Sequence, residues 1–393
     1  MKILFWLSIG LDRRSPSEHL LTAMIERLSE AEHEVYVLQK ATGGPNPNLP
    51  SGMYKNGVKT VCIGSKIPAK SNFVARYLSD IKYVLKCNKF LKYNKFDRVF
   101  LQSSNVAGFQ CGLLKKTQPR TPVTFNIQDI FPENAVYSHQ ISKTGFIYKI
   151  LSIEQRYAYQ YAKRLVTISE DMKEELITIG ADREKISVIY NWSYQDEMYE
   201  PEQFEDEIVN NLFSENTFNV VYAGNIGLMQ NVDIVIKAAQ QLKDRQDIQF
   251  HIIGEGLYRS QLEREVAEKQ LSNVKFHEML SADHAPAIYC KADVNIVPLA
   301  KDVYKTALPS KTATCLASGR PMILAIGRDS LLGKKIHAET GAPLLDSDDV
   351  EGLVSAVIGF KEKVFSYESK NCFLSHFQMR MNSSNYAALI SGE

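Results

Sequence analysis

The amino-acid sequence predicts an α/β protein built from two doubly wound domains. The first observation is length, because a chain of 393 residues is long for one hydrophobic core. The second is rhythm: short β-rich apolar runs alternate with longer amphipathic runs, as in a parallel sheet covered by helices. The third is a polar, acidic interruption at residues 192–216, after which the alternation resumes.

The first half of the chain supplies the first series of strands and helices. It opens at Lys2–Ser8, a short apolar run followed by charged residues 12–14 where a secretion signal would carry small residues, so we interpret it as a buried strand. The other expected strands are Glu34–Leu38, Val58–Ile63, Arg98–Gln102, Val123–Ile127, Arg164–Ile168 and Ile186–Tyr190. The expected helices are His19–Leu28 behind Ser17, residues 72–94, Thr144–Ala162 and Asp171–Ile179.

The second half repeats this pattern. In open α/β sheets ligands bind at the carboxyl ends of the strands, and two facing domains would set both crevices against one cleft. Functional residues are therefore expected directly after strands. The expected strands are Phe218–Ala223, Ile248–Ile253, Val274–His277, Val294–Pro298 and Pro321–Ala325. The expected helices are Val232–Leu242, Tyr258–Glu268, Asp283–Cys290, a segment from Lys311 to near Gly319, and Val350–Phe360.

Composition excludes several classes of function. Hydrophobic residues make up 45% of the chain and charged residues 23%, as in ordinary globular proteins, and the net charge of +1 gives no support for nucleic-acid binding. No apolar run is long enough to span a bilayer, so any membrane contact is expected to be peripheral. The six cysteines show no C-x-x-C pair, which favours buried free thiols in a reducing cytosol.

One segment is strongly basic. Residues 65–98 contain nine lysines and arginines against two aspartates, a local charge of +7. Within it residues 72–94 have a helical pattern, with apolar residues on one face and lysines 82, 86 and 89 on another. This pattern suits the surface of an anionic bilayer. A helix docked on its own sheet with its lysines in water is an equally good interpretation.

Pro309, Ser310 and Lys311 open a helix after an apolar strand and a polar loop. A helix start presents unpaired N–H groups and the positive end of the helix dipole, and a lysine there adds a full charge. We interpret this as a cradle for a nucleotide-sugar diphosphate. An ordinary strand–loop–helix unit with a solvent-exposed lysine is the alternative.

Glycine turns follow three of the expected strands. Gly224 and Gly227 frame a Gly-x-x-Gly turn, and Gly254 and Gly256 frame another, so backbone amides can approach a phosphate. Residues 276–279, ending at Met279, could supply backbone contacts to a base. Gly10 follows the first strand, but the Gly-x-Gly-x-x-Gly pattern of dinucleotide dehydrogenases is absent there. Glycines serve many turns, so plain connectors remain possible.

Acidic residues follow other strands. Asp129 and Glu133 come after strand Val123–Ile127, where Asp129 could hold an acceptor hydroxyl and Glu133 could orient it; a turn with a helix cap is the alternative. Asp346 and Asp348 form the only Asp-x-Asp spacing. They stand just before helix Val350–Phe360 and suit its N-terminus better than a metal, so no metal is expected.

The order of these motifs resembles family 4 retaining glycosyltransferases of the GT-B fold, in the bacterial branch that builds O-antigen, capsule and other surface polysaccharides. The resemblance covers nearly the whole chain. In the second half it is carried by Gly224-Asn-Ile-Gly227, Ile253-Gly-Glu-Gly256, Val297-Pro-Leu299, Pro309-Ser-Lys311 and Ala317-Ser-Gly-Arg-Pro321. In the first half it is carried by Gln128-Asp-Ile-Phe-Pro-Glu133, Thr167-Ile-Ser-Glu-Asp-Met172 and Val188-Ile-Tyr-Asn-Trp192.

Four positions depart from the wider family. Many members carry Glu-x7-Glu before the Ala-x-Gly-x-Pro element, whereas this chain has Thr306 and Thr314. Many members also place arginine and lysine after the strand that opens the second domain, whereas this chain has Asn225 and Gln230. Thr314 can hydrogen-bond a ribose hydroxyl, but less strongly than a carboxylate would. The departures increase the dependence on Lys311 and on backbone amides.

The resemblance implies two facing Rossmann-like domains, residues 1–195 for the acceptor and 196–365 for the nucleotide-sugar. A C-terminal helix within residues 366–393, expected over Tyr367–Leu389, would return to the first domain. It implies a retaining, metal-independent transferase of hexosyl or N-acetylhexosaminyl groups, with no cofactor. The donor would be a nucleotide-sugar, most simply a UDP-sugar. The acceptor would be a lipid-diphosphate-linked saccharide at the cytoplasmic face of an anionic membrane.

The expected site residues fall into three groups. Catalytic roles are expected for Lys311, Asp129 and Glu133. Acceptor contacts are expected at Gly10 and Ser15. Donor contacts are expected at Gly224, Asn225, Gly227, Gln230, Gly254, Gly256, Met279, Pro309, Ser310 and Thr314. Two alternatives stay open: a UDP-sugar 2-epimerase of similar architecture, and a non-catalytic subunit that binds a nucleotide-sugar for a partner transferase.

Overall fold

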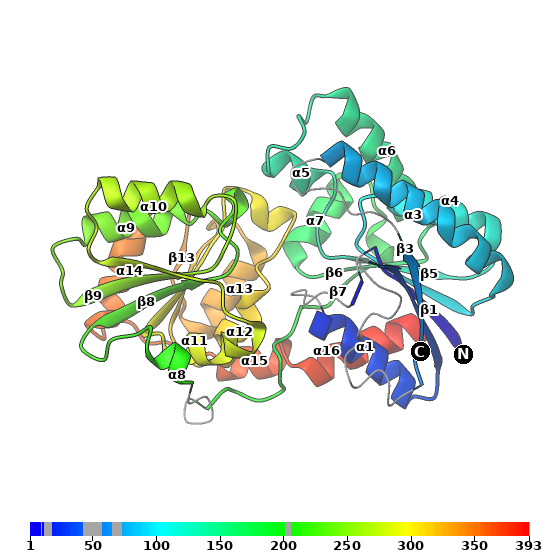
Figure 1. Cartoon of the computed structure of the whole chain (residues 1–393). Helices are drawn as coiled ribbons and strands as arrows, with labels where there is room; N and C mark the ends of the chain where they lie inside the picture. The colour runs from blue at the N-terminus through cyan, green and yellow to red at the C-terminus, as the bar shows by residue number, and fades with distance from the viewer. Residues whose placement is uncertain (9, 12–17, 42–56, 65–72, 201–205, 393) are drawn as a thin grey trace. The chain divides into compact units, whose positions relative to one another are not determined.

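A computed structural model describes residues 1–8, 10–11, 18–41, 57–64, 73–200 and 206–392. The chain divides into two compact units, one of residues 1–190 with 380–393 and the other of residues 191–379. Each unit is a parallel sheet with helices on both faces (Figure 1). The predicted α/β class with two doubly wound domains is therefore confirmed. The division falls at residue 190, against 195 in the prediction.

The first unit contains a seven-stranded sheet in the order β3-β2-β1-β4-β5-β6-β7. Neighbouring strands pair in parallel, for example Leu4 of β1 with Tyr36 of β2 and Val99 of β4. The first apolar run is thus a central strand. The strands are β1 (Lys2–Trp6), β2 (Glu34–Ala41), β3 (Lys59–Gly64), β4 (Arg98–Gln102), β5 (Val123–Ile127), β6 (Arg164–Thr167) and β7 (Ile186–Val188).

The helices of the first unit lie on both faces of this sheet. In Figure 1, α3, α4 and α6 lie on one side and α1 and α16 on the other, and α4 packs against both α3 and α6. The helices are α1 (Glu18–Glu30), α3 (Phe73–Tyr93), α4 (Ala107–Thr117), α5 (Glu133–Tyr137), α6 (Phe146–Tyr161), α7 (Glu170–Thr178), the short 3₁₀ turn η1 (Arg183–Lys185) and α16 (Met379–Ser391). Helix α4 was not predicted, because two glycines and the lack of an N-terminal side-chain cap weaken its local signal.

The C-terminal segment returns to the first unit, as the predicted fold requires. Tyr386 of α16 is fully buried there, and its hydroxyl donates to Oδ1 of Asn126 at 2.9 Å. The segment forms two helices, however, and not the single helix expected over Tyr367–Leu389. The first of them, α15 (Lys370–His376), stays on the second unit, where Phe373 is buried and the Ser369 hydroxyl donates to the Leu316 carbonyl at 2.7 Å.

The second unit contains a six-stranded parallel sheet in the order β10-β9-β8-β11-β12-β13. Its strands are β8 (Phe218–Ala223), β9 (Ile248–Ile253), β10 (Val274–His277), β11 (Val294–Pro298), β12 (Met322–Ala325) and β13 (Leu344–Leu345). Its helices are α8 (Glu207–Asn210), α9 (Asp233–Gln241), α10 (Arg259–Glu268), α11 (Ala285–Lys291), α12 (Lys311–Ala317), α13 (Leu331–Thr340), α14 (Val350–Lys361) and α15, with 3₁₀ turns η3 (Leu228–Gln230), η4 (Ala282–His284) and η5 (Val303–Lys305).

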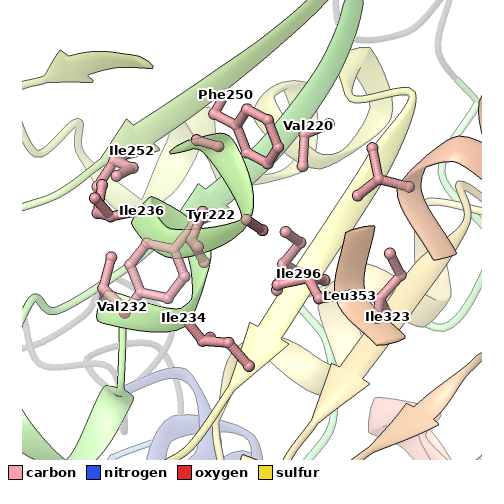
Figure 2. Close-up of a cluster of buried hydrophobic side chains, with 14 of the residues drawn as sticks. Val220, Tyr222, Val232, Ile234, Ile236, Phe250, Ile252, Ile296, Ile323 and Leu353 are labelled. Carbon is pink, nitrogen blue, oxygen red and sulfur yellow. The ribbon is translucent and has the colours of Figure 1, made fainter. Parts of the chain in front are cut away.

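A continuous apolar core fixes the strands of this second sheet. Figure 2 shows Tyr222 of β8, Phe250 of β9 and Ile296 of β11 with side chains from α9 and α14. Each of these three side chains is at most 1% exposed. Because β8 and β9 are held in register by this core, the turns that follow them are held in register too.

Two sequence-level expectations about cysteines and membranes also bear on the fold. All six cysteines are free thiols, five of them buried and Cys62 partly exposed, as expected. None of the described helices combines the length and the apolarity that crossing a bilayer would require.

Candidate functional site

The side chain of Lys311 ends in a buried position beside an aromatic ring. Its Nζ lies 3.6 Å from the centroid of the Tyr222 ring, and among the described residues it has no hydrogen-bond partner. The stem of the side chain keeps some solvent contact, but the amine itself is buried. Burial lowers the pKa of Lys311 to about 7. A cation–π contact is worth about 2 kcal/mol when desolvated, less than the cost of burying an unpaired charge.

The Lys311 amine lies directly against the glycine turn that follows β8. A Cβ atom on Gly224 would come within 2.9 Å of Nζ and 3.3 Å of Cε. Gly224 also has a φ of +141°, which side chains rarely tolerate. Tyr222 connects the Lys311 amine to the glycine turn. Its ring faces the amine, and its hydroxyl donates to the Asn225 carbonyl in the turn. Glycine is therefore required at position 224 by both space and backbone conformation.

The two predicted glycine turns form one unit. A Cβ on Gly254 would lie 1.9 Å from the Gly224 carbonyl oxygen, and a Cβ on Gly256 would lie 2.1 Å from that of Ile226. The backbones are joined directly, since Gly224 N–H donates to the Ile253 carbonyl at 2.9 Å and Ile226 N–H donates to Glu255 at 2.8 Å. The structure thus brings Gly224, Gly254, Gly256 and Lys311 together.

Asn225 and Gln230, which replace the arginine and lysine expected from the resemblance, bind each other. Asn225 Nδ2 donates to Gln230 Oε1 at 2.9 Å. This bridge passes over Gly227, where a Cβ would lie 2.7 Å from Gln230 Oε1 and 2.9 Å from Asn225 Nδ2. Asn225 and Gln230 therefore shape the turn after β8, and the ammonium of Lys311 is the cationic group that touches Gly224.

Arg259, at the start of α10, is a site residue that the sequence did not reveal. Its Nη1 donates to the carbonyl of Gly254 at 2.7 Å and to that of His277 at 2.9 Å, so it ties together the loops after β9 and β10. It also pairs with Glu255 and Glu263. The sequence pattern that could have indicated Arg259 is an arginine three residues after Gly256, followed four residues later on the same helix by a glutamate. Met279, in the loop that follows β10, is half exposed.

The start of α12 differs from the cradle predicted for it. The helix has only seven residues, and the exposed Ser310 stands at its N-cap without a side-chain capping bond. Pro309 instead accepts the Thr312 hydroxyl at 2.9 Å. Thr314 is buried within the helix, and Thr306 is buried and donates to the Val303 carbonyl. The helix dipole acts only near a helix terminus, and α12 has about two turns. The Lys311 side chain therefore contributes more positive charge to the site than the helix does.

The predicted acceptor residues belong to the first unit. Asp129 follows β5 and its side chain is exposed, although desolvation of its carboxyl group raises the pKa of Asp129 to about 6. Glu133 opens α5 and is only 5% exposed; its Oε1 accepts the Tyr148 hydroxyl at 2.7 Å, and burial raises its pKa. Gly10 is buried next to Leu11, whose N–H donates to Gln39 Oε1 at 2.7 Å. Ser15 lies outside the described residues.

The Asp-x-Asp segment has a structural use in the second unit. Asp349 Oδ1 accepts the Gly352 N–H at 2.8 Å and so caps α14, while its Oδ2 pairs with Arg328 at 2.8 Å. Asp346 accepts the backbone N–H of Arg328 at 2.9 Å. The residue that caps α14 is therefore Asp349, directly after the Asp-x-Asp pair, while Asp346 binds the backbone of Arg328.

Comparisons with known proteins match this arrangement. Residues 17–192 match Glycosyltransferase Family 4, and residues 217–362 match Glycosyl transferases group 1. The chain is 27% identical over 218 residues to the putative colanic acid biosynthesis glycosyl transferase WcaI of Escherichia coli K12, across 55% of this chain and 53% of that protein. It is 23% identical over 215 residues to the probable glycosyltransferase WbjE of Pseudomonas aeruginosa, with the same two coverages.

The aligned region spans about half the length of these curated relatives. Among solved structures, the chain is similar to Anabaena HepE, crystallised in complex with UDP and glucose. The TM-score is 0.75 at 14% identity, and the match covers 100% of both chains.

Proposed function

The chain belongs to Glycosyltransferase Family 4 and has the GT-B fold, and on that premise we propose that it transfers a sugar from a nucleotide-sugar to a saccharide acceptor. The buried amine of Lys311 is the observation that supports this most strongly. A buried ammonium without a counter-charge is costly, and an anion bound beside it would remove that cost. Besides the Tyr222 ring, the amine lies against Gly224, which has no side chain and leaves the backbone of its turn accessible.

We infer that the anion is the diphosphate of the donor. Lys311 would neutralise charge that grows on the leaving diphosphate, while the turns at Gly224 and Gly254 give it close access to the backbone. Tyr222 and Arg259 would hold these groups in place, since Tyr222 faces the amine and Arg259 binds the Gly254 carbonyl. The proposed chemistry is retaining and needs no metal, with the departing phosphate oxygen taking the proton of the acceptor hydroxyl.

On the acceptor side the two carboxylates differ in environment. Asp129 keeps solvent access, whereas Glu133 is almost fully buried, so Asp129 is the better candidate to hold the acceptor hydroxyl. Glu133, buried and bonded to Tyr148, would position the loop that carries Asp129. Carboxylate oxygens accept hydrogen bonds from hydroxyl groups, and a buried glutamate fixes a loop through its hydrogen bonds.

We propose a UDP-sugar as donor and a lipid-diphosphate-linked saccharide of a surface polysaccharide, such as O-antigen or capsule, as acceptor. HepE binds UDP and glucose, and WcaI is described as a colanic acid biosynthesis enzyme. The proposed location is the cytoplasm, at the inner face of the membrane. The basic helix α3 would be one contact, because it exposes Lys82, Lys86 and Lys89 on its surface.

Release of UDP with and without acceptor tests the proposed function. We expect the purified protein to release UDP from its donor only when a lipid-linked saccharide extract is present, and to do so equally in EDTA. Conversion of a UDP-sugar into a different UDP-sugar without acceptor would establish the 2-epimerase alternative. Tight UDP binding by thermal shift with no turnover, but with stimulation of a second transferase, would establish the partner-subunit alternative.

The pKa of about 7 for Lys311 predicts that UDP binding weakens above neutral pH. The ammonium form binds the diphosphate and is stabilised by it, so binding above the pKa of the free protein must take up a proton. The Kd for UDP should rise by roughly tenfold per pH unit from pH 7 to pH 9, where the phosphates of UDP stay ionised. Titration calorimetry at each pH measures this.

Lys311→Arg is the matched control for the pH series. Arginine stays charged throughout this range, so its Kd should change little with pH, even if the larger group binds UDP less tightly. A flat Kd in the parent protein from pH 7 to pH 9 would refute the assignment of Lys311 to the diphosphate.

A further inference from the structure

The outer face of α6 exposes four large apolar side chains. Phe146 is 76% exposed, Ile147 50%, Ile150 48% and Ile153 68%. Single exposed apolar residues are ordinary on protein surfaces, but these four fall within eight consecutive residues of one helix. Phe146, Ile150 and Ile153 follow the spacing i, i+4, i+7, which places them along one stripe.

The charges on this face are positive. Lys149 and Arg156 are exposed between and beside the apolar residues. The helix has one acid, Glu154, and its carboxylate turns inward: Oε1 accepts the Phe109 N–H at 3.0 Å and Oε2 accepts the Gln155 amide at 3.1 Å. The carboxylate of Glu154 thus binds the start of α4, and the outer face of α6 presents cations and apolar groups.

The opposite face of α6 holds it firmly on the first unit. Gln155 is buried and donates to the Ser104 carbonyl at 3.0 Å. Tyr159 is buried and stacks on Phe125 of β5 with ring centroids 6.0 Å apart. A helix anchored in this way keeps its outer face presented without a change of shape. In Figure 1 this helix lies at the surface of the first unit, beside α4.

We propose that the outer face of α6 docks on an anionic phospholipid bilayer. Its apolar stripe would enter the boundary between headgroups and acyl chains, while Lys149 and Arg156 contact lipid phosphates. Each well-placed basic residue strengthens such binding by about fivefold. The purpose of this contact rests on the proposed function, in which the acceptor is held in a membrane. The contact itself depends only on the surface of the first unit.

The face of α3 is a weaker candidate than that of α6. It also exposes apolar residues, among them Val74, Leu78 and Leu85, but these are spread over twelve positions of a 21-residue helix. One of its lysines, Lys86, is bound to the Gly64 carbonyl at 2.8 Å. The proposal therefore assigns the apolar part of the membrane contact to α6, with α3 adding charge at most.

Vesicle flotation with the full chain tests this assignment. We expect binding to phosphatidylglycerol-containing vesicles and at least tenfold weaker binding to pure phosphatidylcholine vesicles. The variant Ile150→Glu/Ile153→Glu should lower the partition coefficient at least tenfold. The matched control Ile208→Glu/Val364→Glu changes the charge equally at exposed positions of the second unit and should stay within twofold. A Tm and a far-UV circular dichroism spectrum unchanged from the parent protein show that both variants are folded.

Four results would overturn the proposal. These are no vesicle binding by the parent protein, equal binding by the α6 variant, equal loss in the control, or loss only when Lys82, Lys86 and Lys89 of α3 become glutamate. A parent protein that ignores vesicles but forms dimers that the α6 variant abolishes would reassign the face to a second copy. Flotation uses no nucleotide, so its result is independent of whether sugar transfer is observed.

Discussion

Replacing Lys311 with methionine or alanine is expected to lower the turnover of sugar transfer by roughly 10² or more, as for other preorganised charges that act on the transition state. The loss should appear in kcat more than in KM, because the charge on the leaving diphosphate grows as its bond to the sugar breaks. Acceptor-dependent UDP release, measured over a range of donor concentrations, separates the two parameters.

The same substitution should leave the ligand-free protein at least as stable as before. Methionine keeps an apolar stem beside Tyr222 and removes a buried charge that has no hydrogen-bond partner among the described residues. Exchange of a buried charge for an apolar group of similar volume is often neutral or stabilising. Thermal unfolding should therefore show an unchanged or higher Tm, which distinguishes loss of function from loss of fold.

Lys291→Ala is the control for this experiment. Lys291 is an exposed lysine at the end of α11 in the same unit, and its removal should leave both turnover and Tm unchanged. If Lys311→Met transfers sugar at the parent rate, the buried amine has no part in catalysis and the proposed site is wrong. A large fall in Tm would instead show that the amine has a structural partner.

The second large effect is expected at Gly254. A Cβ at this position would lie 1.9 Å from the Gly224 carbonyl oxygen, and the φ of Gly254 is +156°. Gly254→Ala should therefore push the two turns apart and lower the free energy of unfolding by about 2–4 kcal/mol, from backbone strain and overpacking together. UDP binding should fall with it, because the Gly224 turn beside Lys311 would move. Chemical denaturation and calorimetry measure the two effects.

Gly319→Ala separates strain from collision. Gly319 also has a positive φ, +67°, but a Cβ there would meet only the Met198 side chain, at an ordinary 3.5 Å. This variant should lose only about 1 kcal/mol and keep its UDP affinity. Equal stability losses at Gly254 and Gly319, or full UDP affinity in Gly254→Ala, would show that the close approach of the two turns does not matter for binding.

Strand positions were the most predictable part of this fold. The predicted strands Arg98–Gln102, Val123–Ile127 and Ile248–Ile253 coincide with β4, β5 and β9. Buried parallel strands are continuous apolar runs, so the residues themselves mark them. Helices α4 and α13 were missed, because their glycines and weak periodicity hide a helix that packing against neighbours stabilises.

The candidate site was predictable in its residues but not in its contacts. Gly224, Gly254 and Lys311 stood out from motif order, since glycines and a lysine after strands are visible along the chain. The sequence did not indicate the roles of Tyr222 and Arg259. Tyr222 looks like a core residue of a strand, and Arg259 looks like a surface residue of a helix. The burial of Glu133 and the weak start of α12 also came only from the folded chain.

The sequence by itself therefore determined the α/β class, the two-domain organisation, the family and the residues that follow each strand. These are properties of local pattern and order, which need no knowledge of distant neighbours. The tertiary structure alone decided that the Lys311 amine lies buried against Tyr222 and Gly224, and that α6 turns its acid inward and its apolar stripe outward. Whether a side chain is buried or a charge is paired depends on contacts between segments that are distant in the sequence, and only the folded structure shows these contacts.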